Sequence, residues 1–100
     1  MNFETKISEI EIVPVKPSSG LIGFASFVLD DRYYVSSVAI YTRLDSLGYR
    51  LVYPTKKVGE RNINIFHPIN REVSQVIDEA VIEKVNELFY ESQQNRGTIS

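Results

Sequence analysis

Short apolar runs, rich in β-branched and aromatic residues, alternate with clusters of proline, glycine and aspartate over the first two thirds of the chain. Runs of this length and composition are typical of β-strands. The pattern predicts five strands, at residues 7–15, 21–29, 33–41, 49–53 and 62–66, and a loop at residues 56–60. The tight polar connection Asp30-Asp31-Arg32 follows the second strand, so the second and third strands are predicted to form an antiparallel hairpin.

After Pro68 the apolar positions change to helical spacing, with charged positions on the opposite face. The apolar face carries Val73, Val76, Ile77, Ala80, Val81, Val85, Leu88 and Phe89. This pattern predicts one helix over about residues 70–91, with Asn70 as its N-cap because the side-chain oxygen can accept a hydrogen bond from a first-turn N–H. The predicted fold class is α+β, an antiparallel sheet of four to five strands with one long C-terminal amphipathic helix packed on one face.

A chain of 100 residues is long enough for one domain with a single core and too short for two. We assign residues 1–92 to this domain and expect the polar residues 93–100 to form a disordered tail. No apolar run has the length of a membrane span, and the N-terminus shows no export signal. The absence of cysteine excludes disulfides and thiol nucleophiles. We therefore expect a cytoplasmic protein without a membrane partner.

The predicted strand LIGFASFVL, at residues 21–29, is apolar at both odd and even positions and hence on both faces. One helix covers only one face of a sheet. A second apolar face that stays exposed usually marks an interface. We therefore expect a homodimer whose interface uses the face or edge of the sheet that the helix leaves uncovered.

His67 is the only histidine, and its ordinary pKa lies near neutrality, so a general-base role is the sharpest catalytic hypothesis. It has no partner motif, because the sequence contains no G-x-S-x-G, no H-E-x-x-H and no second histidine. His67 and Pro68 stand where a strand leads into the helix capped by Asn70, so we interpret these residues as a structural junction. Asp30 and Asp31 are interpreted as turn residues rather than cation ligands. We predict no catalytic site, metal, cofactor or small-molecule substrate.

The net charge of −2 hides a basic middle segment. Residues 32–71 carry seven basic and two acidic groups, whereas the segments on either side are acidic. The cations nearest the predicted loop are Arg50, Lys56, Lys57 and Arg61. Cations clustered in this way can follow a phosphate backbone without reading its sequence, so we predict a nucleic-acid site there. Lysines on a hairpin also serve solubility and edge protection, and that alternative stays open.

Several short motifs occur in a distinctive order: ASFVLD at residues 25–30, YPTKK at 53–57, a glycine turn, and INIFHPIN at 63–70 before the helix. The most specific part of this order consists of Pro54, Thr55, Lys56, Lys57, Gly59, His67, Pro68 and Ile69. Over about residues 7–91 the sequence resembles the SpoVG family, the stage V sporulation protein G or septation regulators of bacteria.

The resemblance implies a small α+β protein that is dimeric, cytoplasmic and not an enzyme, and that binds DNA or RNA as a regulator of septation, sporulation or gene expression. It places the basic loop of the family at Lys56, Lys57 and Arg61. This sequence departs from the family pattern in its first strand, which is usually basic but reads EIEIVPV, in a shorter loop, and at Ile63, a basic position in the family. These departures remove positive charge and bear on nucleic-acid affinity more than on the fold.

Two hypotheses for the function follow. The first is a dimeric nucleic-acid-binding regulator of the SpoVG type that uses the basic hairpin. The alternative is a non-enzymatic protein-interaction module that regulates septation or transcription by docking a partner on the sheet edge or on the acidic helix face. That face carries Asp78, Glu79, Glu83 and Glu87, which would repel phosphates.

Overall fold

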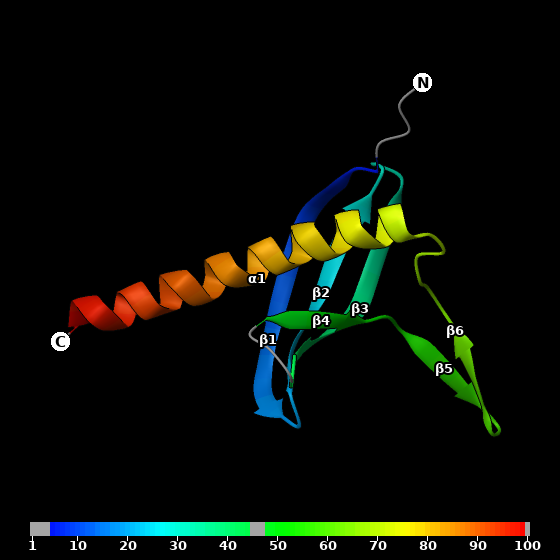
Figure 1. Cartoon of the computed structure of the whole chain (residues 1–100), viewed down its shortest axis with the longest axis horizontal. Helices are drawn as coiled ribbons and strands as arrows, with labels where there is room; N and C mark the ends of the chain where they lie inside the picture. The colour runs from blue at the N-terminus through cyan, green and yellow to red at the C-terminus, as the bar shows by residue number, and fades with distance from the viewer. Residues whose placement is uncertain (1–4, 45–47, 100) are drawn as a thin grey trace.

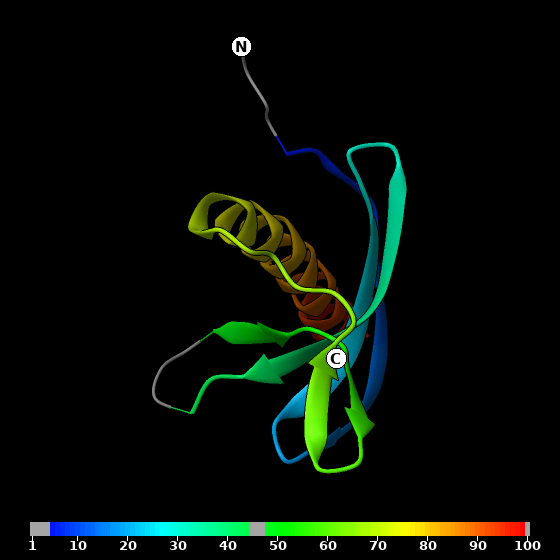
Figure 2. The same cartoon turned by 90° about the vertical axis from the view of Figure 1, so that its right-hand side faces the viewer.

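The computed structural model describes the backbone of residues 5–44 and 48–99, and the side chains of this part up to Leu88. Its elements are β1 (Ile7–Ser18), β2 (Leu21–Leu29), β3 (Tyr33–Thr42), β4 (Tyr49–Val52), β5 (Thr55–Val58), β6 (Arg61–Asn64) and α1 (Arg71–Ile99). Strands β1 to β4 form an antiparallel sheet in that order, and β5 and β6 form a separate antiparallel pair. Helix α1 crosses one face of the larger sheet (Figures 1 and 2). The predicted α+β class is confirmed.

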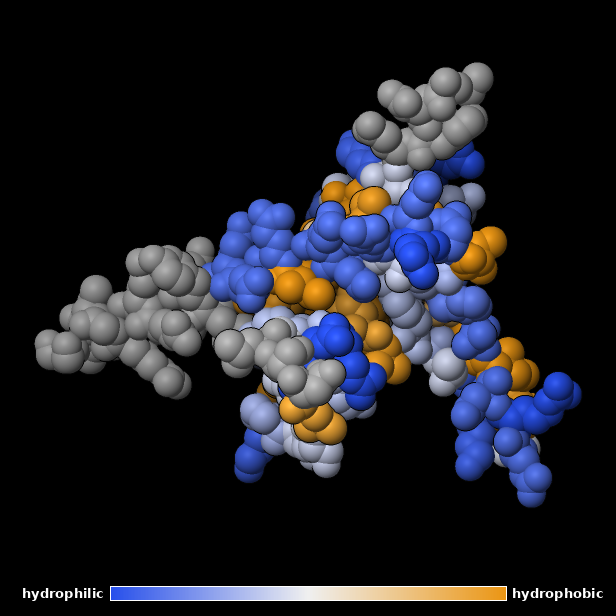
Figure 3. All heavy atoms as spheres, in the orientation of Figure 1, coloured by the Kyte–Doolittle hydropathy of each residue, from blue (hydrophilic) through white to orange (hydrophobic). Residues whose placement is uncertain are grey.

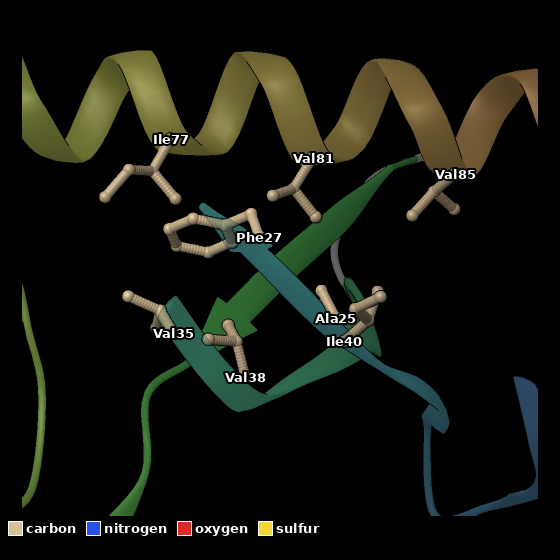
Figure 4. Close-up of a cluster of buried hydrophobic side chains, with 8 residues drawn as sticks. All are labelled: Ala25, Phe27, Val35, Val38, Ile40, Ile77, Val81 and Val85. Carbon is tan, nitrogen blue, oxygen red and sulfur yellow. The ribbon is translucent and has the colours of Figure 1, made fainter. Parts of the chain in front are cut away.

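The core lies between the larger sheet and one face of α1. It consists of Ala25, Phe27, Val35, Val38, Ile40, Ile77, Val81 and Val85. The three helix residues among them are spaced four apart, so they form one stripe along α1. Figure 4 shows this stripe pointing toward Phe27 and the β3 side chains. Ile77, Val81 and Val85 of the predicted apolar helix face therefore pack on the sheet, whereas the side chain of Phe89 lies outside the described residues.

The predicted hairpin of β2 and β3 is confirmed. Its turn places Asp30 and Asp31 in the left-handed region, with φ of 53° and 57°, and the Arg32 N–H donates to the Leu29 carbonyl at 3.0 Å. Two consecutive left-handed residues give a type I′ turn, whose twist matches that of the paired strands. Asp31 also accepts a 2.8 Å hydrogen bond from Lys6 Nζ, which ties the turn to the residue before β1.

Helix α1 begins one residue after Asn70. The Val73 N–H donates to Asn70 Oδ1 at 2.9 Å, which confirms Asn70 as the N-cap. The helical backbone extends beyond the predicted end and includes residues 93–99. The division into a domain over residues 1–92 and a tail over 93–100 stays a prediction. Within the described residues, no helical segment combines the length and the apolar character required to cross a bilayer.

The separate pair of strands differs from the prediction of a loop at residues 56–60 and a strand at 62–66. Instead Lys56 and Lys57 lie on β5, residues 59 and 60 form the turn, and β6 ends at Asn64. Every residue of both strands is exposed, so no alternation of buried and exposed positions marks β5 in the sequence.

Candidate nucleic-acid interface

The strands β5 and β6 and the turn between them form an arm, residues 55–64, that extends away from the larger sheet and from α1 (Figures 1 and 2). The Ile65 N–H closes the base of the arm by donating to the Pro54 carbonyl at 3.0 Å. The ring centroids of Tyr53 and Phe66 lie 5.8 Å apart, and both side chains pack against the core. The arm is thus anchored at its base, while its strands are exposed to solvent.

Three of the predicted phosphate-binding residues, Lys56, Lys57 and Arg61, lie on the arm and are exposed. Glu60 is the only acidic residue of the arm. Across the part of the chain that the structure describes, none of the three cations forms an ion pair with a carboxylate. Figure 3 shows hydrophilic side chains gathered over the arm, at the lower right. An approaching anion therefore meets cations that are not already paired.

The strand register divides the arm into two faces of different chemistry. Lys56 pairs with Ile63 and Val58 with Arg61, and directly opposed residues share a face. We call this side the mixed face, and its residues are Lys56, Val58, Arg61 and Ile63. We call the other side the amide face, and its residues are Thr55, Lys57, Asn62 and Asn64. Lys56 and Lys57, adjacent in sequence, therefore point to opposite sides of the arm.

The fourth predicted cation, Arg50, belongs to β4 in the larger sheet rather than to the arm. It lies opposite Tyr41 on β3, and its guanidinium carbon is 4.9 Å from the centroid of the Tyr41 ring. This cation–π contact restrains the side chain without neutralising its charge. The structure brings three of the predicted cations together and places Arg50 on a different sheet.

The predicted junction residues lie between β6 and α1. His67 is exposed, and its Nδ1 donates to the Pro68 carbonyl at 3.0 Å. Asn70 provides the cap described above, so each of the three residues contributes to the path from strand to helix. Among the described residues, no three histidine or carboxylate groups gather closely enough to hold a metal ion. The structural role of His67 stays a prediction.

The sequence interpretation missed an electrostatic interaction between Tyr53, at the base of the arm, and Asp78 on α1. The Tyr53 hydroxyl is buried and has no hydrogen-bond partner among the described residues. Burial raises the pKa of Tyr53, and the negative charge of Asp78 on α1 raises it further. Burial also raises the pKa of Asp78, which the sequence placed with Glu79 and Glu83 on a solvated acidic face. Asp78 is half-buried, whereas Glu79 and Glu83 are exposed.

The face of the larger sheet opposite α1 carries an apolar row that spans all four strands. Val13 pairs with Phe24, Phe24 with Ala39, and Ala39 with Val52. Val13 is 60% exposed, and Phe24 and Val52 are each 37% exposed. Their neighbours along the strands, such as Ala25, are buried under α1. The apolar second face predicted from the sequence is therefore present and partly exposed.

Comparison with known proteins places these features in one family. The SpoVG family model matches residues 5–87, which include both sheets and α1 as far as Glu87. Three relatives, each named "Putative septation protein SpoVG", illustrate the similarity. The relative from Phytoplasma australiense is 29% identical over 85 residues, covering 84% of this chain and 86% of its own length.

The relative from Clostridioides difficile is 28% identical over 83 residues, covering 82% of this chain and 88% of its own length. The relative from Finegoldia magna is 31% identical over 85 residues, covering 84% of this chain and 77% of its own length. The matched region contains the arm, the junction before α1 and the core stripe of the helix. The chain belongs to the SpoVG family.

Proposed function

We propose that this protein is a dimeric, cytoplasmic regulator of septation, sporulation or gene expression that binds DNA or RNA through the arm. The observation that carries the proposal is the exposure of Lys56, Lys57 and Arg61 on a projecting pair of strands, without ion-paired partners in the described part of the chain. Such cations bind phosphates by displacing condensed counterions. The proposal includes no catalysis, cofactor, membrane or small-molecule substrate.

Binding to nucleic acid is expected to depend steeply on salt. Three phosphate contacts per arm would give a slope of about −2.7 in a plot of log affinity against log salt on duplex DNA, since each contact contributes roughly −0.9. Fluorescence anisotropy of labelled duplex DNA, repeated at several salt concentrations, measures this slope. Lack of binding at low salt to duplex DNA and to single-stranded RNA alike would contradict the proposal.

The dimer is proposed to form through the row of Val13, Phe24, Ala39 and Val52. We expect the pure protein to sediment as a dimer at micromolar concentration. Burial of this partly exposed apolar row in an interface removes apolar surface from water, which is favourable. Analytical ultracentrifugation of the wild type and of Phe24→Asp tests this, with the variant expected to shift toward monomer. A monomeric wild type would rule the dimer out.

A protein-interaction module is the second candidate function. The observation in its favour is that Glu79, Glu83 and Glu87 are exposed on α1, away from the core stripe. Glu87 Oε2 lies 3.8 Å from Lys84 Nζ. Such exposed ion pairs contribute little to stability, so this face of the helix stays acidic. Failure of every nucleic-acid probe at low salt, in the experiment above, would favour this candidate.

A further inference from the structure

The amide face of the arm contains hydrogen-bonding groups that the fold does not use. Asn62 and Asn64 lie on the same side of β6, and no hydrogen bond of either side chain is found within the described residues. Asparagine is depleted in strands, so its presence at both positions does not stabilise β6 itself. Thr55 and Lys57, opposite the asparagines on β5, add a hydroxyl and an ammonium group.

We propose that the amide face reads base edges in the major groove of duplex DNA, with Asn62 and Asn64 as specificity-determining residues. This inference rests on the proposed function, since it requires that the arm bind nucleic acid. An asparagine side chain carries a donor and an acceptor and can pair with N6 and N7 of adenine. Val58 and Ile63, on the mixed face, offer no such group.

The dimensions of the arm suit the groove. The B-form major groove is about 12 Å wide and admits a two-stranded β-ribbon. Asn62 and Asn64 are two residues apart on one strand, or about 6.8 Å at roughly 3.4 Å per residue. That spacing equals about two steps along the bases of one DNA strand. Each asparagine can therefore face a different base pair.

The composition of the arm favours a duplex over a single strand. Residues 55–64 contain no aromatic side chain, whereas recognition of unpaired bases depends on stacking against aromatic rings. Duplex RNA is disfavoured because side chains cannot read its deep, narrow major groove. With the amide face toward the groove floor, Lys56 and Arg61 on the mixed face stay near the rim, where the phosphates lie. Lys57 is on the amide face, and its long, flexible side chain has to bend back to the rim to make the third phosphate contact.

Selection from duplex DNA with a randomised centre, followed by affinity measurements on the enriched and a scrambled sequence, tests the inference. Wild type is expected to prefer the enriched sequence. Asn62→Ala/Asn64→Ala is expected to lose about 5- to 150-fold of that preference for each lost base contact, with an unchanged salt slope, since all three cations remain. The matched control Val58→Thr/Ile63→Thr changes the mixed face and is expected to keep the preference.

The outcomes separate this inference from the proposed function. Salt-sensitive binding without any enriched sequence, or a double asparagine variant that keeps the full preference, overturns the role of the amide face and leaves binding by the arm intact. Enrichment only from a parallel pool of single-stranded RNA likewise overturns it. Failure of wild type to bind any probe overturns both.

Discussion

Replacement of Phe27 by alanine is expected to lower the free energy of unfolding by about 3–5 kcal/mol. Phe27 is fully buried on β2, where it pairs with Val35 on β3 and its ring lies beneath Ile77 of α1 (Figure 4). Removing its ring takes away buried apolar surface and leaves a cavity under the helix. A domain of this size is stabilised by only about 5–15 kcal/mol, so the loss is a large fraction of the total. Urea denaturation followed by circular dichroism measures it.

Phe24→Ala is the matched control, because Phe24 lies on the same strand with its side chain on the opposite face and is 37% exposed. Phe24→Ala is expected to lower the free energy of unfolding by clearly less than Phe27→Ala does. Both variants need a series of protein concentrations, since dissociation of a dimer would add to the apparent loss. Equal losses in the free energy of unfolding for the two variants, at the lowest protein concentration, would contradict the assignment of Phe27 to the buried face of β2 and of Phe24 to the opposite face.

The sequence predicts those elements whose buried residues follow a regular spacing. The β2–β3 hairpin and the N-cap of α1 follow from apolar periodicity and from turn and cap chemistry. Strand β3 shows the limit of that reasoning. Val35 and Val38 are three residues apart but both buried, because a bulge with Ser37 at φ 63° adds one residue to β3 opposite β2. Strict alternation would place these two valines on opposite faces.

The arm was harder to predict for a different reason. Its strands bury nothing, so their pairing depends on the turn at Gly59, where φ is 64°, and on the anchored base rather than on a hydrophobic pattern. The identities of the cations are evident from the sequence. Their division between two faces requires the pairing of Lys56 with Ile63 and of Lys57 with Asn62. Because every residue of β5 is exposed, the sequence pattern does not show that β5 is a strand, and this pairing cannot be predicted from it.

The structure shows where the acidic residues of the first strand lie relative to the arm. Glu9 and Glu11 are exposed on β1, at the edge of the larger sheet, whereas the arm cations belong to the separate pair of strands. The acidic residues of the first strand therefore lie on a different sheet from the arm, whereas the charge lost at Ile63 is lost from β6 of the arm itself. Charges on the arm are expected to dominate short-range phosphate contacts, because exposed charges more than about 10 Å apart are largely screened at 0.1 M salt.

Reversal of all three arm cations, in Lys56→Glu/Lys57→Glu/Arg61→Glu, is expected to abolish binding to nucleic acid. For the wild type, three contacts predict about a 40-fold loss of affinity between 50 and 200 mM salt for each arm. The variant removes these contacts and replaces them with charges that repel phosphate, so no salt-sensitive complex should form even at the lower concentration. Anisotropy titrations on duplex DNA measure the effect, and circular dichroism establishes that the variant folds.

The control Lys16→Glu/Arg32→Glu/Lys84→Glu changes the net charge by the same amount at positions outside the arm. It is expected to keep most of the affinity and nearly the full salt slope, since long-range attraction is weaker than direct phosphate contact. An equal loss in both variants would mean that binding responds to net charge alone, because only a localised site makes the position of the reversed charges matter. Undiminished binding by the arm variant would place the site elsewhere on the protein.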